Sequence, residues 1–100
     1  MSTLFTLNHS WHRAPWLYEK LAYAGKDDAI LLLEGGVLGL QSPLTLVSFL
    51  AKCEAQETSV FALEPDLRLR GINNLYESVV LIDYAEFVDL VTRYAKQVAW

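Results

Sequence analysis

The pattern of apolar and polar positions in this chain alternates between short unbroken apolar runs and longer stretches with helical spacing. Ile30 to Leu33 are four consecutive large aliphatic residues, and residues 78–82 (SVVLI) repeat the pattern. Such runs are typical of strands that are covered on both faces, as in parallel sheets. We therefore predict strands at residues 3–7, 29–33, 59–63 and 78–82, and we expect the tail KQVAW to add a short fifth strand.

Helices are predicted between these strands, at residues 16–24 and from Pro43 to about Ala55, where Ser42 is the predicted N-cap. A short helical segment is expected at residues 64–70, and a last helix follows Asp83, whose spacing to Glu86 is that of a capping box. The apolar positions predict the inward faces of the two longer helices. These faces comprise Leu44, Val47, Leu50 and Ala51 in the first, and Tyr84, Phe87, Val88, Val91 and Ala95 in the second.

Strands that alternate with helices at this pace indicate βαβ units and a mainly parallel sheet. The chain has 100 residues, which predicts one α/β domain spanning residues 1–100. Gly35 and Gly36 follow the run at 29–33 directly, where the chain must turn sharply out of a strand. Open α/β sheets place their binding and catalytic sites at such junctions.

The apolar content of the chain is high. Apolar residues make up 53% of the chain and charged residues only 20%. A small domain does not easily bury this excess, so we expect a subunit of an assembly.

A net charge of −4 argues against direct nucleic-acid binding. The single cysteine, the lack of a recognisable signal peptide and apolar runs too short to cross a bilayer predict a cytoplasmic protein with no membrane contact.

Cys53 is the one candidate nucleophile or sulfur carrier. A reactive thiolate needs positive potential, whereas Cys53 lies near the end of a predicted helix, where the dipole disfavours an anion, with Glu54 adjacent and only Lys52 to help. An inert structural cysteine is therefore favoured. Gly35-Gly36 could cradle a phosphate, but no phosphate-binding glycine motif surrounds them, and a plain turn is favoured.

The remaining candidates have simpler interpretations. His9 and His12 form an HxxH beside Arg13 but lack the further ligands that a metal site needs, so we predict no metal and no cofactor. Asp83 and Glu86 could be an acid–base pair, but capping explains both. Three tryptophans lie in loops or at element ends, where aromatic residues are enriched at subunit interfaces. Trp11, Trp16 and Trp100 are thus possible interface residues, and partial packing in the core is the alternative.

Six segments, taken in order, carry a resemblance to a known family: LFTL, HRAPWL, AILLLEGGV, VFALEPDLRLRG, VVLIDYAEFVDLV and QVAW. They resemble the DsrH/TusB family of small sulfur-relay subunits, closest to its TusB branch, over nearly the whole chain. The resemblance implies a three-layer α/β/α fold with a five-stranded parallel sheet. It also implies a hetero-hexamer with homologous DsrE/TusD-like and DsrF/TusC-like subunits, which passes persulfide sulfur from carrier proteins toward 2-thiolation of the tRNA wobble uridine.

In such complexes the sulfur-carrying cysteine belongs chiefly to the TusD/DsrE-type subunit, and Cys53 matches no family cysteine. The loop from Asn8 to Trp11 looks like an insertion relative to the shorter family version. The sequence therefore predicts a non-catalytic structural subunit. Two alternatives stay open: a sulfurtransferase subunit that uses Cys53 as a persulfide carrier, and a small flavodoxin-like module that binds an anion or nucleotide.

Overall fold

The structure, a computed structural model, describes residues 2–9, 24–41, 43–73 and 76–100. Its five strands form one parallel sheet in the order β4-β3-β2-β1-β5. The strands are β1 (Thr3–Leu7), β2 (Ala29–Leu32), β3 (Ser59–Leu63), β4 (Val79–Ile82) and β5 (Lys96–Ala99). The helices are the 3₁₀ helix η2 (Glu34–Gln41), α2 (Pro43–Ala55), α3 (Glu64–Leu69) and α4 (Tyr84–Arg93). The expected fold class, including the fifth strand, is confirmed.

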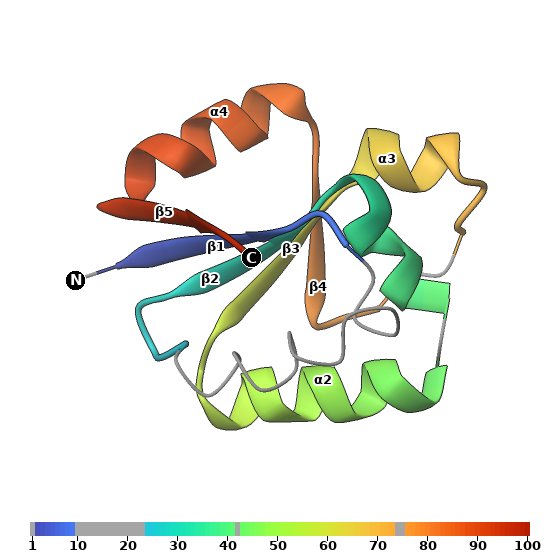
Figure 1. Ribbon diagram of the computed structural model, residues 1–100, viewed down its shortest axis with the longest axis horizontal. Helices are drawn as coiled ribbons and strands as arrows, with labels where there is room; N and C mark the ends of the chain where they lie inside the picture. Colours follow the sequence, from blue (N-terminus) through green and yellow to red (C-terminus); the bar gives the residue numbers. More distant parts are fainter. Residues whose placement is uncertain (1, 10–23, 42, 74–75) are drawn as a thin grey trace.

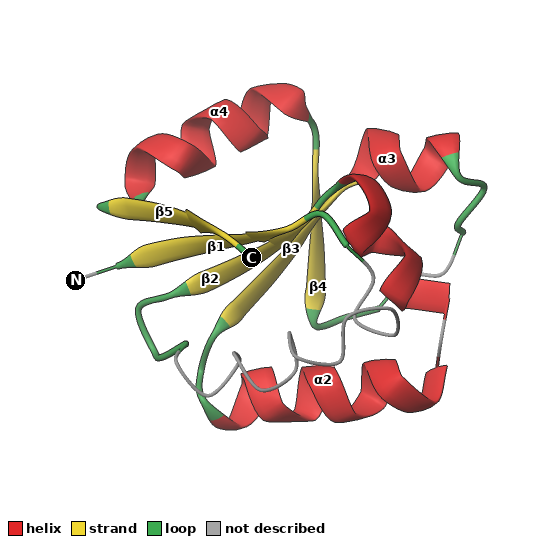
Figure 2. Cartoon of the chain, viewed as in Figure 1, coloured by secondary structure: helices red, strands yellow, loops and turns green. Residues whose placement is uncertain are grey.

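Helices lie on both faces of the sheet, which makes three layers (Figures 1 and 2). α4 covers one face, where Leu90 packs with Leu4, Leu31 and Leu63. α2 and η2 cover the other, where Phe49 and Leu46 pack with Ile30 and Leu32. All four residues of β2 are buried because β2 is the central strand and both of its faces are covered, as the unbroken apolar run predicted.

The predicted inward faces of the two long helices are only partly correct. In α2, Val47 is 66% exposed and Ala51 is exposed, whereas Leu46, Phe49 and Cys53 are buried. Leu50 is half-buried as expected, and Leu44 is not among the residues whose side chains are described. The true stripe is shifted by one position along the helix because the sheet contacts the neighbouring row of side chains.

The same error occurs in α4. Tyr84 and Val88 are 59% and 66% exposed, and Ala95, beyond the helix end, is exposed too. The side chains that face the sheet are Phe87, Leu90, Val91 and Tyr94. Phe87 and Val91 belong to both the predicted and the observed stripe, so the predicted face is rotated around the helix axis rather than opposite to the true one.

The turn after β2 continues into helix further than expected. η2 runs for eight residues, where the sequence analysis expected only a sharp turn at the glycine pair. Gly36 lies against β1, because a Cβ on this residue would stand 2.0 Å from the backbone oxygen of Leu7. The tight-turn interpretation of the glycine pair is therefore supported, with close contact between two segments as its physical reason.

The predicted helix at residues 16–24 and the predicted N-cap Ser42 lie outside the described residues, apart from Ala24, which is buried. Within the described part of the chain, no single helix is long and apolar enough to span a membrane. Glu34–Gln41 and Leu46–Ala55 reach that length and composition only when they are taken together, and they meet at a bend of 106°.

Candidate functional site

Cys53 lies in the last turn of α2 with its side chain turned into the core. It is 2% exposed and packs in the cluster beneath the α2 face of the sheet. Burial raises the pKa of the Cys53 thiol to about 12, because the thiolate would lose its hydration, and the nearby Lys52 charge lowers the pKa by a smaller amount. At neutral pH the side chain is therefore a thiol, which is neither a nucleophile nor a metal ligand.

A surface hollow of about 310 Å³ lies beside this cysteine. Leu50, Cys53, Glu54, Thr58, Val60 and Ser78 line it. Thr58 uses its hydroxyl to donate a hydrogen bond of 3.0 Å to the Gly25 backbone oxygen, so this polar group serves the fold. Glu54 adds an exposed acidic residue to the lining, which disfavours the binding of an anion in the hollow.

The turn out of β2 is fixed by a buried acid that the sequence analysis did not single out. Asp66 is 8% exposed, and its Oδ2 accepts a hydrogen bond of 2.7 Å from the Glu34 backbone N–H. Arg70 lies 3.8 Å away from the other carboxylate oxygen. Glu34 has a φ of 50°, a left-handed conformation that costs a non-glycine residue about 1–2 kcal/mol. A hydrogen bond to a charged acceptor contributes about 1.5–3 kcal/mol, enough to offset that cost.

This arrangement also bears on the phosphate alternative for Gly35-Gly36. The turn residues contact other backbone: Gly36 lies against Leu7, and a Cβ on Gly35 would stand 2.9 Å from the Asn8 backbone oxygen. Two backbone N–H groups that an anion would need are also already engaged, since the Glu34 N–H donates to Asp66 and the Gly36 N–H donates to the Leu33 oxygen at 2.9 Å. The glycines are explained by this packing. The signal for Asp66 in the sequence was the segment ALEPDLRLRG, in which an acid follows a strand end.

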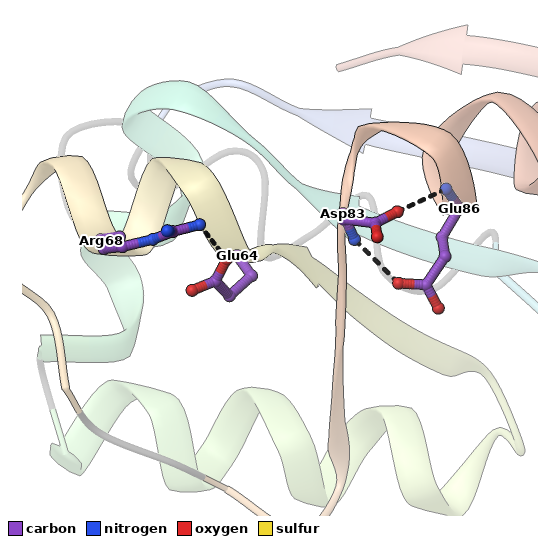
Figure 3. Close-up of polar contacts among 4 residues, drawn as sticks. All are labelled: Glu64, Arg68, Asp83 and Glu86. Atoms are coloured by element: carbon purple, nitrogen blue, oxygen red, sulfur yellow. Dashed lines mark hydrogen bonds and ion pairs between the residues drawn. The ribbon is translucent and has the colours of Figure 1, made fainter.

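Asp83 and Glu86 form the predicted capping box at the start of α4 (Figure 3). The Glu86 N–H donates to Asp83 Oδ1 at 2.8 Å, and the Asp83 N–H donates to Glu86 Oε1 at 3.0 Å. Each carboxylate is engaged by a backbone donor of the helix end, which explains both residues without acid–base chemistry.

Trp100 is the one predicted interface residue within the described part of the chain. Its ring stacks on Phe5 with centroids 4.1 Å apart and an interplanar angle of 21°. Its backbone N–H donates to the Thr6 oxygen at 2.9 Å, and the side chain is half-buried. Trp11 and Trp16 lie outside the described residues, as do His12 and Arg13, while His9 is exposed. Within the described ranges, no three His, Cys, Asp or Glu side chains gather where they could hold a metal ion.

Large apolar side chains nevertheless remain on the surface. The most exposed among the described residues are Val47, Leu69, Val80, Tyr84 and Val88, at 52–80%. Three of them, Val47, Tyr84 and Val88, occupy positions that the sequence predicted to be buried. Val80 lies in β4, an edge strand, so one of its flanks has no neighbouring strand in the described chain. The described part of the chain thus exposes large apolar side chains while its cysteine is buried.

Comparison with known proteins agrees with the predicted family. A family model described as DsrH like protein matches residues 10–97. Protein TusB of Yersinia enterocolitica is 35% identical over 98 residues, covering 97% of this chain and 99% of that protein. Protein TusB of Escherichia coli K12 is 32% identical over 96 residues, covering 92% of this chain and 98% of that protein.

Solved structures agree with the fold. The crystal structure of the YchN protein from Escherichia coli matches with a TM-score of 0.68 at 15% identity, covering 99% of this chain and 97% of that one. The solution structure of Tm0979 from Thermotoga maritima matches with a TM-score of 0.59 at 25% identity, covering 93% of both chains. The low identity to YchN makes that match informative about the fold alone.

Proposed function

This chain belongs to the DsrH family, and from that membership we propose that it is a subunit of a sulfur-relay complex for 2-thiolation of the tRNA wobble uridine. The match over residues 10–97 and the relatives named Protein TusB support the proposal. Its proposed partners are homologous subunits of the DsrE/TusD and DsrF/TusC types, in a cytoplasmic hetero-hexamer. The net charge of −4 favours leaving tRNA contact to other components.

Within that complex the chain has a structural role and does not carry sulfur itself. The observation that supports this most directly is the state of Cys53. To accept sulfur, a thiolate must attack the terminal sulfur of a donor persulfide, so that a new S–S bond forms, the old one breaks and the donor cysteine leaves as a thiolate. A pKa of about 12 leaves roughly one thiolate per 10⁵ thiols at pH 7. Although Cys53 borders the surface hollow, only 2% of it is exposed to a donor.

The test compares Cys53→Ser with deletion of the whole chain, in cells that carry no other copy. We expect deletion to abolish 2-thiouridine in tRNA, because the complex fails to assemble, and Cys53→Ser to leave it nearly unchanged per assembled complex. The 2-thiouridine content is measured by mass spectrometry of digested tRNA, and the amount of complex by immunoblotting of its other subunits. Lost thiolation with a normal amount of complex would show that Cys53 carries sulfur, and the sulfurtransferase alternative would then replace the structural role.

A further inference from the structure

The two edges of the sheet differ in how the sequence protects them. β5 carries Lys96 and Gln97, both exposed, and Gln97 also donates to the backbone oxygens of Val91 and Tyr94. Charged and polar side chains of this kind keep an edge strand from pairing with other chains. β4, at the other edge, reads Val-Val-Leu-Ile and contains no polar residue. Val80 in its middle is 52% exposed.

Both faces next to the β4 edge offer apolar contacts. Val80 shares the α4 face of the sheet with the half-buried Phe61, its register partner on β3. On the opposite face, Leu81 lines a hollow of about 280 Å³. The other residues around this hollow are Glu64, Leu67, Arg68, Ile72 and Asn73. Glu64 and Arg68 form an ion pair of 2.6 Å, visible in Figure 3. The apolar part of the lining is Leu67, Ile72 and Leu81.

This geometry suits an extended strand. Successive side chains of a strand point to opposite faces, so a segment paired with β4 would place one side chain over the Val80 face and the next into the hollow. Backbone hydrogen bonds along an edge supply affinity, and pockets for alternate side chains supply specificity.

Charge selects the occupant. The exposed acids Glu77 and Asp83 stand at the two ends of β4. If β4 paired antiparallel with a second copy of itself, the acids of one copy would lie near those of the other at both ends, which is unfavourable. A segment with Lys or Arg at its ends would bring opposite charges together instead.

We propose that the β4 edge, with Val80 on one face and the hollow at Leu81 on the other, binds an extended strand of another subunit that is apolar in its middle and basic at its ends. The proposal rests on the proposed function only in assigning the strand to another subunit of the complex. Binding at β4 can be measured without any tRNA assay, so the two proposals fail independently.

The experiment titrates the full chain with two short synthetic peptides and follows backbone amide shifts by NMR. One peptide is Lys-Val-Ile-Val-Ile-Lys, and its matched control has Glu at both ends. We expect saturable shifts in β4 and α3 with the lysine peptide and markedly weaker binding of the glutamate peptide. Val80→Lys should abolish binding, whereas Ala99→Lys on the β5 edge should leave it unchanged.

Because Val80→Lys could fail to fold, a second variant reverses a charge at the exposed residue Glu77 instead. Glu77→Lys should lower the affinity for the lysine peptide by up to about fivefold at low salt. Asp27 lies in the turn before β2, and Asp27→Lys should leave that affinity unchanged. Equal affinity for both peptides, no binding, or shifts confined to β5 would overturn the proposal. Self-association of the chain that Val80→Lys removes would also overturn it, because a second copy would then be the occupant.

Discussion

At the scale of single residues, the sequence and the structure both favour an inert Cys53 thiol, but for different physical reasons. The sequence suggested an inert thiol from its place near a helix end, where the dipole disfavours an anion. In the structure the largest effect on its pKa is desolvation, which no local pattern reports. Asp66 was missed for the same reason, because its burial follows from contact with Glu34, a residue 32 positions away.

Cys53 should make the fold sensitive to alkali. Its pKa rises from 9.0 to about 12 on folding, so the unfolded chain loses this proton first. The stability that the group contributes is full below pH 9 and is lost as the pH rises from 9 toward 12. Between pH 8.5 and 10.5 we expect the free energy of unfolding to fall more steeply in the wild type than in Cys53→Ala, by up to about 1.4 kcal/mol per pH unit.

Urea denaturation at several pH values measures this difference. The pKa of Tyr94 is also raised, by desolvation and by the Asp28 charge, while the Arg93 charge lowers it. Because Tyr94 is present in both proteins, its contribution to the pH dependence cancels in the comparison. Parallel pH profiles for the two proteins would mean that Cys53 is accessible to water. The low reactivity assigned to it in the complex would then be in doubt as well.

At the scale of elements, boundaries were predicted better than faces. β3 spans the predicted residues, α2 ends at the predicted Ala55, and the capping box forms at the start of α4. These features depend on residues that are close in the sequence, such as the pair Asp83 and Glu86. The inward side of α4 was only partly correct because two overlapping apolar stripes run along the helix, and only the sheet decides which one is buried.

A pair of substitutions tests the observed face of α4. Leu90→Ala removes a side chain that is 1% exposed and should lower the free energy of unfolding by about 2–5 kcal/mol. Val88→Ala, two positions earlier and 66% exposed, should change it by less than about 0.5 kcal/mol. Thermal or chemical denaturation gives both values. A larger loss for Val88→Ala would mean that the sequence-based face is the correct one.

At the scale of the whole molecule, segments far apart in the sequence meet at the carboxyl ends of the central strands (Figure 1). The Leu33 N–H donates to the Leu7 oxygen at 3.1 Å, and Gly36 then passes over the same oxygen. This contact joins β1 to the start of η2, and Asp66 joins the same turn to α3. The turn after β2 is thus where three parts of the chain are held together.

Gly36→Ala should therefore be far more damaging than an ordinary glycine substitution. The added Cβ would stand 2.0 Å from a backbone oxygen, which forces β1 and η2 apart. We expect a loss of roughly 3 kcal/mol or more, at the upper end for overpacking. Gly25→Ala is the matched control, since among the described residues its Cβ would meet only Asp28 Oδ2, at 3.8 Å. Equal melting temperatures for the two variants would contradict the close approach.

The sequence by itself determined the α/β class, the order of the described elements and the family. Apolar runs and helix signals are local, and a family resemblance is carried by the residues themselves. Tertiary structure alone decided which stripe of each helix is buried, that the carboxylate of Asp66 holds the turn after β2, and that β4 lies at an edge. A four-residue apolar run looks the same in a central strand as in an edge strand, because strand order is set by packing between distant segments.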